Sequence, residues 1–396
     1  MRYLSDGPST PERSGAFLRP ALAGAAATLA GIGLARFSYV PLFPAMVAAR
    51  WIDGGGAGLI GAANLAGYLL GALGGRMVAR RFGTARALDI GMAAAALAFA
   101  ACAWNGGLLY LALWRALAGA AGGVLMALAG PAVQWAVSPV ARGRAGGVVV
   151  AGVGTGVVLS ALIVPLALPL GVSWAWLGLA ALVTSLWAFA HFSWPDAPIP
   201  SSESSPGSSR GAARLFLAYG LSGGGMVSHM VYLSDFAVRG RDLGTAAGSW
   251  VWLLFGAGAI VGTLAGGRAC DRWGASNSLS AWLAVQVLSL AAALVPSAAA
   301  LGAAGFFGGF AGIGISAVAL ARARELAGAG SATLWAGATA AFAAVQAVTA
   351  ILLAALFART GSHALLFGTC LVLSLIGLTV SAGPGRSSTG CVPPVR

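Results

Sequence analysis

One stretch of the chain recurs 191 positions further on, and this repeat constrains the fold more than any other sequence feature. The first copy, residues 67–86, carries three glycines at intervals of four and then a basic turn. On a helix this spacing leaves a stripe without side chains, so that a second helix can pack closely against it. The copies pair as Gly67/Gly258, Gly71/Gly262, Gly75/Gly266, Arg81/Arg272, Phe82/Trp273 and Gly83/Gly274. The repeat indicates two homologous halves.

Composition decides the solvent in which these halves fold. Hydrophobic residues make up 59% of the chain and charged residues only 8%. Soluble domains carry about 25% charged residues, so the sequence excludes a soluble fold and predicts an integral membrane protein. The net charge of +13 is due to arginine alone, since the chain has no lysine. These arginines are dispersed between apolar runs, which argues against a nucleic-acid partner.

The residue types that carry enzyme or metal chemistry are sparse. The cysteines lie far apart, without a CxxC pair, at Cys102, Cys270, Cys370 and Cys391. We therefore expect no metal and no cofactor. A phosphate-binding GxxxxGK[ST] loop requires lysine, so the sequence excludes ATP-driven pumping by this chain alone. The apolar runs contain no catalytic acid or activated nucleophile, and we do not expect an enzyme.

Apolar runs of about 20 residues, long enough to cross a bilayer core of about 30 Å, follow one another along the chain. They are expected near 20–48, 56–79, 86–104, 107–131, 145–168, 172–193, 214–236, 244–267, 277–296, 299–320, 331–357 and 363–383. The predicted fold is an all-α membrane protein with twelve transmembrane helices in two six-helix bundles.

A segment rich in serine and proline separates the two bundles and is typical of a flexible linker. The expected division is an N-terminal tail 1–19, a first bundle 20–194, a linker 195–213, a second bundle 214–383 and a C-terminal tail 384–396.

Arginines are distributed unevenly between alternate loops. If the N-terminus is cytoplasmic, seventeen arginines fall in inner segments and four, Arg50, Arg239, Arg241 and Arg359, in outer loops. Cytoplasmic loops of membrane proteins carry the excess of basic residues. We therefore predict that both termini and the linker are cytoplasmic.

Three ionisable residues lie well within the apolar runs, and two acids, Asp235 and Asp89, lie near the ends of runs. Arg36 and Arg115 lie in the first and fourth runs, His229 lies in the seventh, and Asp235 lies near the outer end of the seventh. A charge inside the membrane costs a few kcal/mol and usually faces a cavity or a partner. A proton-coupled mechanism would have to use His229 or Asp235, because the other acids lie outside the runs or at their ends.

The whole pattern resembles the major facilitator superfamily of transporters, over nearly the full chain. The resemblance rests on the two six-helix halves, the linker, the glycine-striped second and eighth helices, and a fourth-helix motif of Arg115, Gly119, Gly122 and Gly123. The segments GIGLARFSYVPLFPAM and AANLAGYLLGAL look like the YbfB-like bacterial branch. The fifth helix lacks the Gly-Pro dipeptide that marks antiporters in this superfamily.

The resemblance implies a gating motif after the glycine-striped helix of each half. An acid in this loop is thought to help latch the cytoplasmic gate of such transporters. The second copy has that acid as Asp271, whereas the first copy has Arg80 in its place. The candidate gating residues are Gly75, Arg80, Arg81, Gly83, Gly266, Asp271, Arg272 and Gly274.

The resemblance also implies that helices 1, 4, 7 and 10 line a central cavity. The candidate solute-binding residues are Arg36, Tyr39, Asn64, Tyr68, Arg115, His229 and Tyr232. A structural role remains open for each: an arginine held by carbonyls of a broken helix, a tyrosine that packs, or an amide or histidine that joins helices. Gln286 and Gln346 are expected only to join neighbouring helices.

These features predict a secondary active transporter that moves a small polar solute by alternating access. Two fixed arginines without a buried acid favour an organic anion or a neutral polar metabolite over a cation. The alternatives are a multidrug-type exporter and a membrane sensor that has kept the fold without transport. The expected partners are the solute, the lipid bilayer and, in coupled transport, protons. We expect a monomer in the bacterial inner (plasma) membrane.

Overall fold

The computed structural model describes residues 18–138, 142–195, 197, 209–328 and 331–382. Every regular element in these residues is helical, which confirms the all-α prediction. The expected tails and most of the expected linker 195–213 lie outside the described residues. The first helix after the linker begins at Ser209, a few residues before the expected start of the second bundle.

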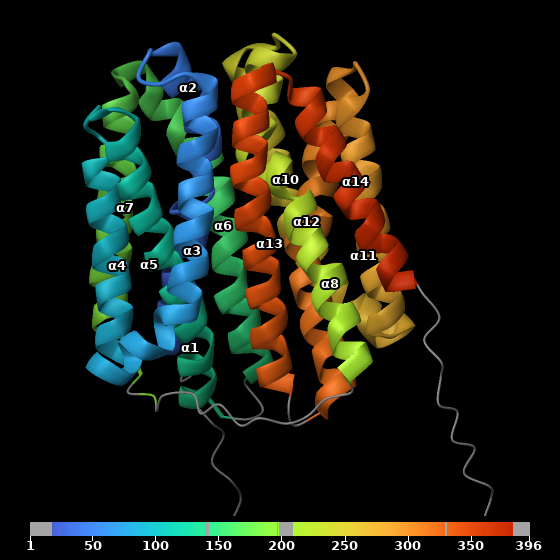
Figure 1. Cartoon of the computed structure of the whole chain (residues 1–396). Helices are drawn as coiled ribbons and strands as arrows, with labels where there is room; N and C mark the ends of the chain where they lie inside the picture. Colours follow the sequence, from blue (N-terminus) through green and yellow to red (C-terminus); the bar gives the residue numbers. More distant parts are fainter. Residues whose placement is uncertain (1–17, 139–141, 196, 198–208, 329–330, 383–396) are drawn as a thin grey trace, which may run out of the picture.

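The first half contains the first six predicted crossings, and the first of these is composite (Figure 1). Its elements are α1 (Leu18–Thr28), η1 (Leu29–Leu34), α2 (Tyr39–Ala48), α3 (Gly54–Phe82), α4 (Thr84–Ala101), α5 (Gly107–Ala136), α6 (Arg142–Ala167), η2 (Leu168–Leu170) and α7 (Val172–His191).

The second half repeats this order, and its first crossing is again composite. Its elements are α8 (Ser209–Gly225), η3 (Ser228–Tyr232), α9 (Leu233–Asp235), η4 (Phe236–Gly240), α10 (Gly244–Trp273), α11 (Ala275–Leu294), α12 (Ala298–Ala327), α13 (Ser331–Thr360) and α14 (His363–Ala382).

Length and composition of these segments suit a membrane. Within the described residues, 11 spans are long and apolar enough to cross a bilayer. The other predicted crossing, the seventh, is divided into α8, η3, α9 and η4, so no single helix in it reaches that length. Leu70, Leu109 and Leu166 are 69%, 74% and 79% exposed, and so much exposed apolar surface requires a lipid environment.

The first and seventh crossings are interrupted at equivalent positions. In the first, turns at residues 35–38 separate η1 from α2, and Pro41, which has no N–H to donate, lies in the first turn after them. In the seventh, the helix is interrupted at Met226, 191 residues after Ala35 and directly after a run of three glycines. Both interruptions adjoin π-helical turns, which are frequent at functional sites.

The glycine stripes lie where two helices of the same half meet. A Cβ added to Gly71 on α3 would lie 2.0 Å from the carbonyl oxygen of Ala120 on α5. A Cβ added to Gly262 on α10 would lie 2.0 Å from the carbonyl oxygen of Phe310 on α12. Gly67 and Gly258 make contacts as close as these, while Gly75 and Gly266 would meet side chains at 3.2 Å. Only glycine allows these backbones to approach so closely.

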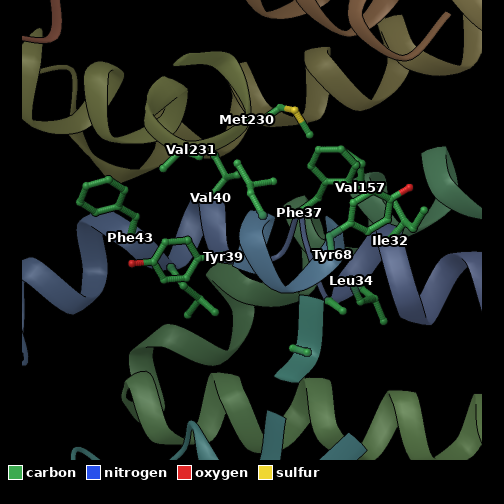
Figure 2. Packing of buried hydrophobic residues seen from close by; sticks show 14 of the residues in the cluster. Ile32, Leu34, Phe37, Tyr39, Val40, Phe43, Tyr68, Val157, Met230 and Val231 are labelled. Atoms are coloured by element: carbon green, nitrogen blue, oxygen red, sulfur yellow. The ribbon is translucent and has the colours of Figure 1, made fainter. Parts of the chain in front are cut away.

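The two halves meet mainly along α3 against α13 and along α6 against α10. Figure 1 shows α3 and α13 side by side at the front of the molecule. At the end that carries the α2–α3 connection, a Cβ on Gly55 would lie 2.7 Å from Cβ of Ala358. Deeper in the molecule, Met230 and Val231 of η3 lie opposite Val40 (Figure 2). The interrupted crossings therefore lie at the junction of the halves.

Candidate functional site

Arg36 lies at the interruption of the first crossing and reaches across to the second half. Its side chain is buried, and Nη2 donates a hydrogen bond to Oε1 of Gln346 on α13. The same Nη2 lies 3.6 Å from Sδ of Met230 on η3. The guanidinium carbon lies 5.0 Å from the ring centre of Tyr68, within the range of a cation–π interaction. Arg36 thus connects the two halves at their junction.

The positive charge of Arg36 has no carboxylate beside it in the part of the chain that the structure describes. The ion pairs there involve Asp89, Asp235 and Glu325. Nε of Arg36 is buried and has no hydrogen-bond partner among the described residues. A guanidinium is matched best by the two oxygens of a carboxylate or a phosphate group. The junction therefore presents a positive charge that the protein satisfies incompletely.

Arg115 and Asn64 hold the main chain at the same interruption. Nη2 of Arg115 donates to the carbonyl oxygen of Ala35 at 2.5 Å, and Nδ2 of Asn64 donates to that oxygen at 3.1 Å. Asn64 also donates to the carbonyl oxygen of Arg115 at 2.9 Å. The hydroxyl of Tyr39 donates to the carbonyl oxygen of Ala57 at 2.7 Å, and the Arg115 guanidinium lies over the Tyr39 ring. These contacts stay within the first half.

His229 is directed into the second half. Its Nε2 lies 3.0 Å from Oγ of Ser289, which in turn donates to the carbonyl oxygen of Ala304 at 2.9 Å. Its ring meets that of Phe367 edge-on, with 5.3 Å between ring centres. None of its described hydrogen bonds or ring contacts is with Arg36, although both residues lie on predicted cavity helices.

Asp235 and Tyr232 lie nearer the α2–α3 end. Asp235 is fully buried, accepts hydrogen bonds from Nε and Nη2 of Arg239, and lies 2.7 Å from Nε2 of His363. Arg239 and His363 line an open cavity of about 800 Å³ to which both halves contribute residues. The hydroxyl of Tyr232 has no hydrogen-bond partner in the described residues and points at Gly58, where a Cβ would lie 2.2 Å away.

The two copies of the gating motif lie at the opposite end, on the α3–α4 and α10–α11 turns. Gly83 and Gly274 have φ angles of 85° and 77°, a region that favours glycine. Asp271 is exposed and makes no hydrogen bond or ion pair with another described residue. Instead, Glu325 on α12 accepts the backbone N–H of Ala275 at 2.6 Å. The arginines of the motif, Arg80, Arg81 and Arg272, are exposed.

Four residues of these clusters lie outside the sequence-based candidates. Gln346 gave one signal, an isolated amide in an apolar run, and was expected only to join helices. Arg239 was counted among the arginines of an outer loop, so its pairing with Asp235 was not anticipated. His363 and Glu325 lie far from their partners in sequence, and no spacing pattern connects them.

The comparisons with known proteins identify a family and a fold. The family model described as the uncharacterised MFS-type transporter YbfB matches residues 28–381. No curated protein matches the chain. A crystal structure of the nucleoside transporter NupG has a TM-score of 0.74 at 12% identity and covers 92% of this chain and 98% of its own. The human organic anion transporter MFSD10 (TETRAN) has a TM-score of 0.68 at 17% identity, with coverages of 94% and 100%. At such identities the likeness shows the fold alone.

Proposed function

The chain belongs to the YbfB family of major facilitator superfamily transporters, so it is a multi-pass membrane transporter and not an enzyme, and we propose that it moves a small polar solute by alternating access. Two homologous halves around a central site are the arrangement on which alternating access depends. The interrupted first and seventh crossings at the junction of the halves support this mechanism, because a broken helix exposes backbone groups where a solute can bind.

One observation carries the chemical class of the solute. Arg36 places a fixed positive charge between the halves, and no described carboxylate neutralises it. A cation would be repelled there by several kcal/mol at the low effective dielectric of the site. An organic anion, or a neutral polar metabolite with well-placed acceptors, would complete the hydrogen bonds of the guanidinium.

Within this proposal the candidate residues divide into two groups. Arg36 contacts the solute, and the ring of Tyr68 supports the guanidinium from one side. Arg115 and Asn64 act as positioning residues, because their polar atoms hold the main chain beside Arg36. Tyr39 acts as one through its hydroxyl, which ties α2 to the Ala57 carbonyl oxygen of α3. His229 and Tyr232 shape the second half around the site.

The charge of Arg36 disfavours one of the two alternative functions, and uptake tests the other. A multidrug-type exporter of lipophilic cations would have to place its cargo beside an unneutralised arginine. A sensor without transport would show no uptake of any solute in proteoliposomes. The two similar structures are named for a nucleoside and for an organic anion, and both descriptions are compatible with a polar solute.

An uptake screen with purified protein in proteoliposomes tests the proposal. Organic anions and neutral polar metabolites should accumulate, whereas tetraphenylphosphonium should not. Arg36→Ala should abolish uptake, and Arg36→Lys, which keeps the charge but loses the planar fork, should weaken it about tenfold or more. Preferential export of lipophilic cations, or full uptake by folded Arg36→Lys protein, would contradict the anion assignment.

We further propose that any proton coupling uses Asp235 rather than His229. Asp235 is held by Arg239 and His363, which line a cavity that opens at the α2–α3 end. His229 is enclosed among Ser289 and aromatic rings. Uptake by Asp235→Asn protein should lose its dependence on a pH gradient while His229→Gln protein retains it. Full gradient-driven uptake by Asp235→Asn protein would exclude this role.

The arginine distribution supports an inner-membrane protein whose termini and linker are cytoplasmic, and a monomer suffices because one chain supplies both halves. Cysteine labelling at position 204 and at the exposed Asn105 in intact cells tests the orientation. A reagent that cannot cross the membrane should label position 105 and leave position 204 unlabelled; the reverse pattern would overturn the topology.

A further inference from the structure

The amide of Gln346 occupies the position opposite Arg36 at the junction of the halves. Its Oε1 accepts from Nη2 of Arg36, and its Nε2 lies 2.9 Å from Sδ of Met230. Gln346 is 1% exposed and Met230 is 4% exposed, so neither is available to bulk water. The amide is thus a polar group of the second half in direct contact with the central charge of the first.

We propose that the amide oxygen of Gln346 occupies the position of an anionic oxygen of the solute at Arg36 until the solute displaces it. This inference rests on the proposed function, since it assumes that Arg36 binds an anionic solute. It names the group with which that solute must compete.

The hydrogen-bond inventory of Arg36 supports displacement. A guanidinium has five N–H donors, whereas an amide offers one oxygen and no charge. In the described residues Arg36 gives one hydrogen bond to Gln346 and approaches a thioether, a weak acceptor, and its Nε has no partner. A carboxylate or phosphate group brings two or more oxygens together with the opposite charge. Exchanging the amide oxygen for such a group therefore gains both hydrogen bonds and neutralisation.

A second buried glutamine shows what a purely structural amide looks like in this protein. Nε2 of Gln286 donates to the carbonyl oxygen of Ser222 at 2.9 Å and to Oγ of Ser374 at 3.2 Å, and its Oε1 accepts from Oγ of Ser222 at 2.9 Å. All of these partners belong to the second half. The Gln346 amide contacts Arg36 across the junction, and its other described partner is a sulfur atom.

Anion binding to the purified full chain tests this role without requiring the natural solute. The probes are acetate and inorganic phosphate, each titrated against sodium chloride at equal ionic strength, and the readout is thermal stability in detergent. Wild-type protein should be stabilised by these probes. Gln346→Glu places a fixed carboxylate beside Arg36, so it should raise the apparent dissociation constant about tenfold or more. Gln346→Met removes the internal competitor and should lower that constant several-fold.

Control variants separate this inference from the proposed function. Gln286→Met should lower thermal stability but leave the response to anions as in wild type. If Arg36→Met protein responds to anions as wild type does, the anion site at Arg36 fails and the role of Gln346 fails with it. If the response requires Arg36 but is the same in wild type, Gln346→Glu and Gln346→Met, only the inference about Gln346 is overturned. Should Gln346→Glu not fold, Gln346→Met alone decides, since an unchanged or weakened response contradicts displacement.

Discussion

The interruptions of the first and seventh crossings are equivalent in position and differ in the way the main chain is held. In the first half the carbonyl oxygen of Ala35 accepts from the side chains of Asn64 and Arg115. In the second half the carbonyl oxygen of Met226, 191 residues later, accepts the backbone N–H of Met230 at 3.1 Å. The position equivalent to Asn64 is Phe255, whose ring stacks on Trp252 with 4.7 Å between centres. The two halves thus share the position of the interruption but not its polar chemistry.

This difference indicates which features of the repeat serve the fold and which serve the solute. Close glycine contacts recur in both halves because backbones separated by so little space allow no side chain. The polar groups at the interruptions are not under that constraint. The first half carries the guanidinium of Arg36, whose main chain is held by Asn64 and Arg115. The second half places a neutral amide and a thioether opposite it. An asymmetric solute, charged at one end, fits such a pair of surfaces.

The largest expected effect is loss of folded protein, and it tests the close glycine contacts that both halves share. Gly71→Ala and Gly262→Ala each place a Cβ 2.0 Å from a backbone carbonyl oxygen, so the helices must separate, at a cost of about 3 kcal/mol or more. Both variants should lose most folded protein in size-exclusion chromatography. Gly74→Ala and Gly267→Ala, whose Cβ atoms would meet nothing within 4 Å, are matched controls and should fold as wild type. Tolerance of alanine in one half alone would break the equivalence of the two packings.

A smaller effect, on stability and on KM, should distinguish the buried polar groups of the first half from those of the second. Asn64→Leu and Gln286→Leu each remove buried hydrogen bonds, and each should lower the free energy of unfolding by about 1–3 kcal/mol. Only Asn64→Leu should also raise KM for uptake, because the main chain that it releases carries Arg36. The check is thermal stability measured beside uptake kinetics on the same preparations. Equal shifts in KM for both variants would remove the distinction between a buried amide that positions Arg36 and a buried amide that only supports the fold.

The smallest expected effect on stability concerns the gating motif. The acid of the motif, Asp271, is not the acid that accepts a hydrogen bond from the α10–α11 turn. Glu325 accepts the N–H of Ala275 at the start of α11, whereas Asp271 has no described partner. Glu325→Ala should therefore lower the free energy of unfolding by about 1 kcal/mol, as loss of a helix cap does. Asp271→Asn should change it by less than about 0.5 kcal/mol, as for an exposed substitution. Thermal unfolding of both variants checks this order, and a larger loss for Asp271→Asn would reverse the assignment.

The fold could be predicted from the sequence because membrane helices follow from local length and hydropathy. The close packing of Gly67 and Gly71 followed from spacing alone, since residues four apart share a helix face. The partners of Arg36 could not be predicted in this way. Gln346 is 310 residues away, and its meeting with Arg36 depends on how α13 is rotated and how far it is shifted along its axis.

The same limit explains the position of His229. Its helix borders the junction of the halves, but one residue rotates a helical side chain by about 100°, and this rotation directs the imidazole to Ser289. For Arg115 the open structural alternative is that it holds its own helix, and its bond to the Ala35 carbonyl oxygen of the first crossing could not be predicted. Its choice between solute and backbone depends on the interruption at residues 35–38, which apolar periodicity does not reveal.

The claim that the halves separate during transport is tested most directly by joining them at the α2–α3 end. Gly55 and Ala358 approach closely there, so Gly55→Cys and Ala358→Cys in a chain without the four native cysteines should form a disulfide after a small adjustment. Proteoliposome uptake of an anion that wild type accumulates should be lost on oxidation, be restored by reductant, and remain unaffected in either single variant. Undiminished uptake by fully cross-linked protein would contradict alternating access between the two halves.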